Sequence, residues 1–134
     1  MGIKTTFNHL QIYIGDGEVS FKFYKELLTY LGYELIVEDK THLGMRNGLT
    51  DIWLKEVPKE NKHNKYSRRK IGVNHVAFAV AKKEDVDKFY KEFLIPKNIQ
   101  TLYNTPKDFP KYTPSYYAVF FEDPDKIKLE VVFL

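Results

Sequence analysis

The stretch NHVAFAV (residues 74–80) has the alternating apolar pattern of a β-strand, yet an ionisable side chain, His75, stands near its start. A near-copy, NHLQIYI (residues 8–14), places His9 at the same point. A single strand histidine is more often a structural residue than a ligand, but recurrence within an internal repeat points to a shared role. The two stretches predict a chain built from two copies of one module.

The same order of patterns follows each histidine. After the strand comes a polar turn and then a helical pattern, and both helical patterns contain the letters FYKE. Three strand-like runs follow in each half, ending in TDIWLKEV (residues 50–57) and KIKLEVVFL (residues 126–134). We therefore predict an α+β fold in which two βαβββ modules form paired four-stranded mixed sheets around a concave ligand cup.

The predicted organisation is one domain with two modules and a polar connection. Module one spans about residues 5–57, the linker residues 58–70, and module two about residues 71–134. The linker is basic, but it contains no recognised nucleic-acid motif, so we expect a solvated loop and no nucleic-acid partner. It also contains His63, which could reach over a site as an acid or base or could be an ordinary surface residue.

Composition narrows the chemistry that the chain can perform. The 134 residues carry a formal net charge of +3 and include no cysteine, which excludes disulfides, thiolate metal ligands and a thiol nucleophile. The first ten residues lack an apolar signal core, and no apolar run approaches the ~20 residues that span a bilayer. We expect a cytoplasmic protein with no membrane partner.

Strand alternation assigns the two histidines to a face. Successive side chains of a strand point to opposite sides, so His9 shares a face with Gln11, while the apolar residues between them face the other way. In the repeat, His75 shares a face with Ala77 and is opposite Val76. Because the purely apolar face suits a covering helix, each histidine is predicted on the concave side.

A carboxylate in the last strand completes a possible ligand set. Glu130 lies between Leu129 and Val131, and a lone charge buried among apolar residues needs a partner. Two neutral imidazoles and one carboxylate suit Fe(II), Mn(II), Ni(II) or Zn(II) and leave coordination positions open. Satisfied structural histidines and a solvated glutamate are the alternative, and spacing alone leaves both open.

These strands, together with the ending FFEDPDKIKLEVVF (residues 120–133), resemble the vicinal-oxygen-chelate superfamily. It includes glyoxalase I, extradiol dioxygenases, fosfomycin-resistance enzymes and bleomycin-resistance proteins. The resemblance implies paired βαβββ modules around one divalent metal ion, with His9, His75 and Glu130 as its ligands and Glu130 able to act as a base. It also implies a small-molecule substrate, and we expect a homodimer.

The sequence departs from the patterns of the individual enzymes. Glyoxalase I has a fourth ligand where this chain has Trp53, so a standard glyoxalase is not expected. Extradiol dioxygenases and fosfomycin-resistance enzymes carry a tyrosine where this chain has Phe120, although Tyr116 on the same face offers a hydroxyl. The family glycine of the last hairpin is replaced by Lys126. The residues predicted to contact substrate are Gln11, Trp53, Tyr116 and Phe120.

Two hypotheses of function follow. The first is a divalent-metal-dependent enzyme of the lyase, isomerase or dioxygenase type that acts on a small oxygen-rich substrate. The second is a metal-free protein of the bleomycin-resistance type that binds a drug or another small molecule between aromatic walls. The complete His-His-Glu set favours the first, and the high aromatic content, 16%, favours the second.

Overall fold

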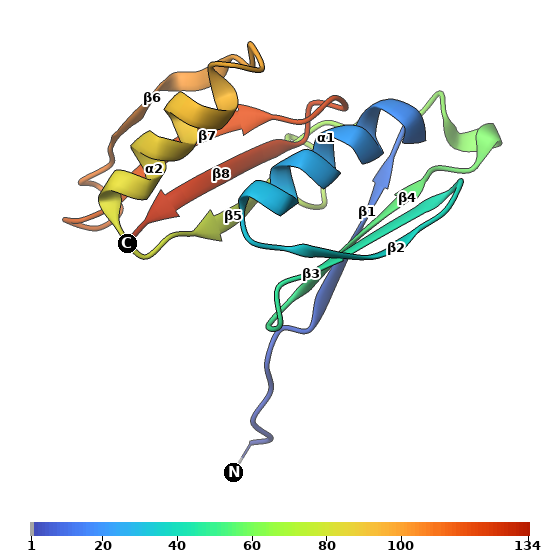
Figure 1. Cartoon of the computed structure of the whole chain (residues 1–134), viewed down its shortest axis with the longest axis horizontal. Coiled ribbons are helices and arrows are strands. Elements are labelled where there is room, and N and C mark those ends of the chain that lie inside the picture. Colours follow the sequence, from blue (N-terminus) through green and yellow to red (C-terminus); the bar gives the residue numbers. More distant parts are fainter. Residues whose placement is uncertain (1) are drawn as a thin grey trace. The chain divides into compact units, whose positions relative to one another are not determined.

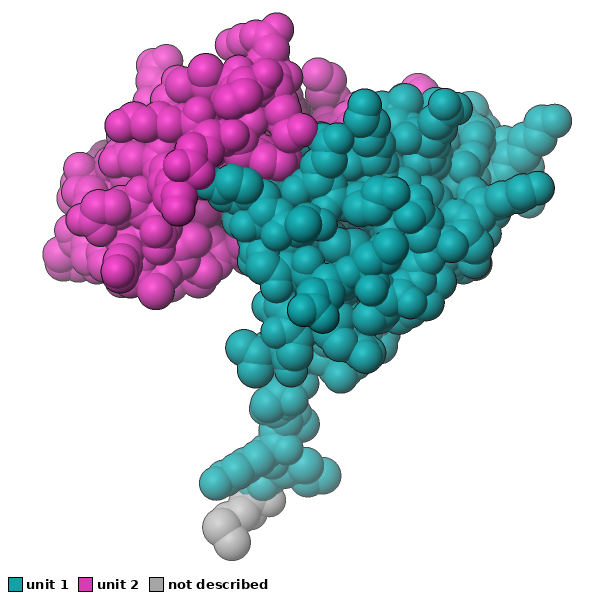
Figure 2. All heavy atoms as spheres, in the orientation of Figure 1, with its two compact units in different colours: residues 1–64 teal, residues 65–134 magenta. Residues whose placement is uncertain are grey.

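The computed structural model describes residues 2–134 and divides the chain into two compact units, residues 1–64 and 65–134 (Figure 2). Each unit contains one four-stranded sheet and one α-helix (Figure 1). Unit 1 comprises β1 (His9–Ile14), α1 (Gly17–Tyr30), β2 (Glu34–Glu38), β3 (His42–Arg46) and β4 (Asp51–Glu56). Unit 2 comprises β5 (His75–Ala79), α2 (Lys83–Phe89), β6 (Thr101–Asp108), β7 (Tyr117–Glu122) and β8 (Lys128–Phe133). A short 3₁₀ helix, Lys59–Asn61, follows β4.

The two sheets have equivalent topology. Their strand orders are β1-β4-β3-β2 and β5-β8-β7-β6. In each sheet the first strand pairs in parallel with the last, and the other pairs are antiparallel. The repeated βαβββ pattern and the mixed sheets predicted from the sequence are confirmed. No helix within residues 2–134 has the length and apolar character needed to cross a membrane.

The core of unit 1 lies between α1 and one face of its sheet. The helix begins after Asp16, whose side chain accepts a hydrogen bond from the backbone N–H of Val19 (3.3 Å) and so satisfies a free amide of the first turn. Its inner face contributes fully buried residues, as do β3 and β4. These residues include Tyr24, Leu27, Leu28, Leu43 and Leu54. The apolar half of each strand pattern therefore meets the helix, as alternation predicts.

The core of unit 2 contains a cluster of aromatic rings. Phe89 on α2 lies 5.4 Å from Phe121 on β7 and 5.2 Å from Phe93, measured between ring centroids. The helical pattern in this half predicts one continuous helix, whereas a π-helical turn, Tyr90–Leu94, follows α2. The wider turn brings the adjacent residues Phe93 and Leu94 into the core together, since both are buried.

The sequence was misleading at β6, where the prolines from Pro106 onward predict an irregular loop. The strand instead continues to Asp108 through a register shift between Leu102 and Lys107. Tyr103 and its neighbour Asn104 adopt positive φ angles of 59° and 55° at this shift. The backbone therefore bulges and resumes pairing, which no period-two pattern reveals.

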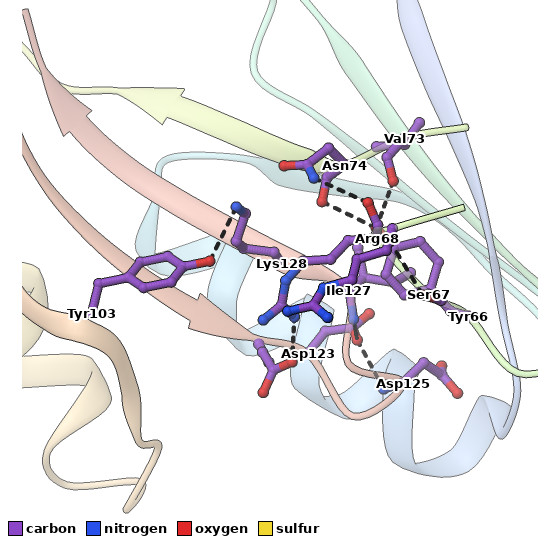
Figure 3. Close-up of polar contacts among 12 residues, drawn as sticks. Tyr66, Ser67, Arg68, Val73, Asn74, Tyr103, Asp123, Asp125, Ile127 and Lys128 are labelled. Carbon is purple, nitrogen blue, oxygen red and sulfur yellow. Dashed lines mark hydrogen bonds and ion pairs between the residues drawn. The ribbon is translucent and has the colours of Figure 1, made fainter. Parts of the chain in front are cut away.

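The last hairpin, between β7 and β8, is stabilised by a side chain of its own turn. The Asp123 carboxylate accepts hydrogen bonds from the backbone N–H groups of Asp125 and Ile127, both at 2.8 Å (Figure 3). Lys126 has a φ of 70°, the left-handed region that favours glycine. The position where the family resemblance expects glycine is thus a left-handed position here, stabilised by the Asp123 side chain.

A tyrosine on β7 makes the stability of unit 2 decrease with pH in the alkaline range. The Tyr117 hydroxyl donates to Asp87 Oδ1 on α2 at 2.6 Å, and burial together with this bond raises the pKa of Tyr117 to about 12. An unfolded tyrosine titrates near ~10, so between these values the folded state keeps a proton that the unfolded state loses, and stability falls as pH rises.

We expect Tyr117→Phe to lose about 1 kcal/mol near neutral pH, the usual value of one hydrogen bond, and to show a shallower loss above pH ~10. Urea midpoints of both proteins at neutral pH and across the alkaline range test this. An unchanged alkaline slope in the variant would show that Tyr117 does not carry the effect.

Candidate metal and substrate site

The residues predicted to form the site fall into one group in each unit. Unit 1 contains His9, Gln11 and Trp53, and unit 2 contains the other four. Those four are His75, Tyr116, Phe120 and Glu130. Within residues 2–134, neither unit taken by itself gathers three His, Cys, Asp or Glu side chains into a metal-binding group. The expected ligand set is therefore divided between the units, and each half is described separately.

In unit 2, the residue before the histidine fixes the orientation of the imidazole. Asn74 Nδ2 donates to the carbonyl oxygen of Arg68 at 3.1 Å (Figure 3). This bond leaves the amide oxygen of Asn74 to face His75. That oxygen, Oδ1, lies 2.8 Å from His75 Nδ1. An amide oxygen can only accept, so Nδ1 of His75 carries the proton and Nε2 presents a lone pair. Metal-binding histidines are commonly oriented in this way by a second partner.

Glu130 occupies the middle of β8 and is completely buried. Its Oε1 accepts a hydrogen bond from the Tyr116 hydroxyl. Its Oε2 has no hydrogen-bond donor within the part of the chain that is described. A buried carboxylate oxygen without a donor is costly, because the charge has lost its hydration.

The unpartnered oxygen of Glu130 faces the free nitrogen of His75. Oε2 lies 3.2 Å from His75 Nε2. Both atoms present lone pairs when the imidazole is neutral and the carboxylate is ionised, so a cation between them relieves the repulsion: either a metal ion bound to both atoms or a proton on one of them. A separation of 3.2 Å suits two ligands that are each about 2.1 Å from one divalent ion. The residues present therefore fit a metal ion.

Tyr116 supports this pair as a hydrogen-bond donor. Alternation correctly placed its side chain on the face that carries Glu130, although the residue lies just before β7. Burial raises the pKa of Tyr116 well above its usual range, and the hydrogen bond to Glu130 raises it further. The phenol stays protonated at neutral pH, holding Glu130 Oε1 and leaving Oε2 free.

Unit 1 repeats the arrangement around its histidine. His9 Nδ1 lies 2.7 Å from Asn8 Oδ1, the counterpart of the Asn74 contact. His9 is opposite Asp51 in the sheet, but that carboxylate forms two hydrogen bonds to Arg46 at 2.8 and 2.9 Å. The Arg46 guanidinium also holds the pKa of Asp51 below its usual range. Asp51 is therefore engaged in an ion pair with Arg46, and His9 is the residue of unit 1 that the sequence predicts as a ligand.

The register of the sheets identifies Trp53 as the counterpart of Glu130. Gln11 is opposite Trp53 in the first sheet, as Ala77 is opposite Glu130 in the second. Trp53 also pairs with Gly44 on β3, and a β-carbon at Gly44 would lie only 2.6–2.9 Å from the six-membered ring of the indole. The six-membered ring of the indole thus lies against Gly44 of β3, on the face that carries Gln11.

We expect Gly44→Ala to displace this indole, because the added methyl group would overlap it. Trp53 is the single tryptophan, so its emission should shift to longer wavelength as the ring becomes more hydrated. Gly2→Ala is the matched control, since a β-carbon there meets no atom within 4 Å. Identical spectra for all three proteins would show that the glycine is not needed to seat the ring.

A pocket of about 490 Å³ opens beside His75 and Glu130 in unit 2. Its aromatic lining includes the predicted residues Tyr116 and Phe120, but also three that sequence reasoning missed, Tyr103, Phe109 and Tyr112. Asn74 and two lysines that were not predicted as site residues, Lys107 and Lys128, also line it. Alternation could have found Lys128, two residues before Glu130. Lys107 and the three aromatic residues come from the bulged β6 and the segment after it, where alternation does not apply.

Comparison with known proteins gives relatives of the same architecture. The sequence model of the Glyoxalase/Bleomycin resistance protein/Dioxygenase superfamily matches residues 6–131. The uncharacterised Bacillus subtilis protein YqjT is 30% identical over 125 residues, covering 93% of this chain and 96% of the relative.

Solved structures agree with the sequence relatives. A glyoxalase candidate from Bacillus halodurans superimposes with a TM-score of 0.86 at 30% identity, covering 96% of this chain and 95% of that one. A lactoylglutathione lyase from Agrobacterium tumefaciens gives a TM-score of 0.70 at 18% identity over 98% and 95% of the two chains, which shows a shared fold. The repeated modules, the equivalent topology of the two sheets and these matches establish that the chain belongs to the Glyoxalase/Bleomycin resistance protein/Dioxygenase superfamily.

Proposed function

We propose that the protein is a divalent-metal-dependent enzyme that acts on a small oxygen-rich substrate, with His9, His75 and Glu130 as the metal ligands. The observation that carries this proposal is the pair of facing lone pairs on His75 Nε2 and Glu130 Oε2, 3.2 Å apart at a fully buried carboxylate. Without a cation this arrangement is electrostatically unfavourable, and a metal ion removes the cost.

Each residue near the pair has a separate role in this proposal. A bound divalent ion supplies a Lewis acid that stabilises negative charge on substrate oxygens. Asn74 holds His75 in the tautomer that leaves Nε2 free, and Tyr116 holds Glu130 through Oε1. The proposed reaction is of the lyase, isomerase or dioxygenase type, and in a lyase or isomerase Glu130 would be the base that accepts the substrate proton. Trp53 in place of a fourth ligand leaves a coordination position for substrate and argues against a standard glyoxalase I.

The rival function is metal-free binding of a small molecule, and the aromatic lining of the pocket favours it. In that case a proton takes the place of the metal ion between His75 and Glu130. The two functions make opposite predictions for added metal, because only the enzyme gains stability from it.

The test is a thermal-denaturation series on protein stripped of metal and freed of chelator. We expect Fe(II), Mn(II), Ni(II) or Zn(II) to raise the melting temperature, since a ligand at 100 times its Kd stabilises by about 2.7 kcal/mol. His9→Ala, His75→Ala and Glu130→Ala should each abolish the shift. His42→Ala is the matched control, because His42 contacts Asp39 and Thr41 instead.

Two outcomes would oppose the proposal. The first is a shift that survives Glu130→Ala, and the second is the absence of a shift with every one of these ions. Addition of catechols to the Fe(II) protein under oxygen then addresses the reaction class, because a ring-cleavage product appears only with a dioxygenase.

A further inference from the structure

The pocket in unit 2 combines flat apolar walls with positive charge. Phe120 is one of the residues that line the pocket. The centroid of the Phe120 ring lies 5.5 Å from that of Phe109 and 5.5 Å from that of Tyr103. The ring of Tyr112 stacks on Phe109 at 5.4 Å and an interplanar angle of 3°. The rings contact one another directly, and the aromatic surface that they present to the pocket favours a ring or another conjugated group over a branched aliphatic one.

The two lysines of the pocket lie against these rings. Lys128 Nζ is 5.4 Å from the ring centroid of Tyr103 and 5.5 Å from that of Phe120, and it lies 3.4 Å from the Tyr103 hydroxyl (Figure 3). Lys107 Nζ is 5.4 Å from the ring centroid of Phe109. Each ammonium group therefore lies within cation–π distance of an aromatic wall of the pocket.

Neither lysine forms an ion pair with a carboxylate of residues 2–134, because the nearest candidates are engaged elsewhere. Glu122 is opposite Lys128 in the sheet but pairs with Arg68 at 2.8 Å. Asp108 follows Lys107 directly but pairs with Lys83 at 3.1 Å. Two ammonium groups and the one carboxylate of Glu130 leave the pocket with a net charge of +1 when His75 is neutral.

The corresponding position of unit 1 shows that the fold itself does not require this charge. Lys128 is opposite His75 in the second sheet, and Asp51 is opposite His9 in the first. Asp51 is neutralised by its two hydrogen bonds to Arg46, whereas Lys128 has no carboxylate partner among the described residues. Of these two equivalent positions, the one in unit 2 carries a positive charge without a carboxylate partner among residues 2–134.

From these contacts we infer that the pocket binds a planar organic anion, an aromatic or conjugated carboxylate. Its ring lies against Phe120 and Phe109, and its carboxylate lies between Lys128 and Lys107. The inference rests on the proposed function in treating this pocket as the substrate site, and it names the class of that substrate. Recognition of ring and charge needs no metal ion, so it can be tested without one.

The test compares three probes on ¹⁵N-labelled protein stripped of metal and freed of chelator, with dissociation constants taken from chemical-shift titrations. Benzoate is planar and anionic, benzamide is its neutral isostere, and cyclohexanecarboxylate is anionic but not planar. We expect benzoate to bind roughly tenfold more tightly than either of the others, and its binding to weaken as salt is raised. The largest shifts should be those of amides lining the pocket, such as Phe120.

Lys128→Met should weaken benzoate binding about tenfold and leave benzamide binding unchanged, because only the charge is removed. Lys128→Arg should restore the preference, and Lys88→Met on α2, a lysine outside the pocket lining, should not alter it. If Lys128→Met fails to fold, Lys107→Met removes the other ammonium group of the pocket and tests the same requirement for positive charge.

Equal affinities for benzoate and benzamide, or a preference that survives both lysine-to-methionine changes, would overturn the inference. Equal affinities for benzoate and cyclohexanecarboxylate would overturn the planar part of it. Failure of the proposed function has a different signature, because it removes the metal-dependent rise in melting temperature and leaves the preference for benzoate in the metal-free protein intact.

Discussion

Replacing Glu130 with glutamine is expected to abolish metal-dependent stabilisation while leaving the metal-free protein as stable as the wild type, or more stable. The buried carboxylate is unfavourable without a cation, because Oε2 faces the lone pair of His75 Nε2 at 3.2 Å. A glutamine keeps an acceptor for the Tyr116 hydroxyl and can direct its NH₂ group at that lone pair. It cannot replace the charge that binds the metal, and we expect the affinity to fall at least ~100-fold.

The measurement is the free energy of unfolding in urea for both proteins, with and without the divalent ion. Glu122→Gln is the control on the neighbouring strand, where the ion pair with Arg68 is partly exposed and worth about 1 kcal/mol or less. A loss of about 3–5 kcal/mol in the metal-free Glu130→Gln protein would indicate a broken buried ion pair. That result would mean that His75 is protonated, as the metal-free rival allows.

Replacing Leu129 with alanine is expected to have the opposite effect to Glu130→Gln. It should cause a large loss of stability and no change in metal affinity. Leu129 is the sequence neighbour of Glu130 but points to the other face of β8, where it is completely buried. Its register partners are Val76 on β5 and Phe121 on β7, both on the side covered by α2. Removing a leucine side chain from such a site costs about 2–5 kcal/mol through lost burial and the cavity that remains.

Leu49→Ala is the matched control, because the same side chain is 84% exposed there and its loss should cost less than ~0.5 kcal/mol. Urea denaturation of both variants gives the comparison, and metal titration of Leu129→Ala below its melting temperature gives the affinity. A loss below about 1 kcal/mol at Leu129, or a large loss at Leu49, would contradict the assigned faces of unit 2.

Alternation explains why so much of the architecture could be predicted. A strand has a side-chain period of two, so one apolar face in NHVAFAV is enough to place His75 on the opposite side. The same rule separates Glu130 from Leu129, and these two assignments needed only local patterns. Trp53 was singled out by the family resemblance instead, and the sheet register makes it the counterpart of Glu130.

The remaining parts of the pocket depend on geometry that is not periodic. Tyr103 has a positive φ within the bulge of β6, so the residues after it are out of step with any regular strand. Phe109 and Tyr112 lie beyond β6 and reach the pocket through packing against one another. Lys128 does not form an ion pair with Glu122 because Arg68, which lies far away in the sequence, pairs with that carboxylate instead. No local pattern predicts such a competition for one carboxylate.

The most direct test of the central claim is the metal content of the protein purified without chelator, measured by elemental analysis alongside Glu130→Gln. The proposed enzyme should retain about one divalent ion per chain, as expected for a site built from one His-His-Glu set, and the variant should retain almost none. Wild-type protein without bound metal that also fails to take up Fe, Mn, Ni or Zn ions would contradict the proposal. It would leave a metal-free small-molecule-binding protein as the function of this chain.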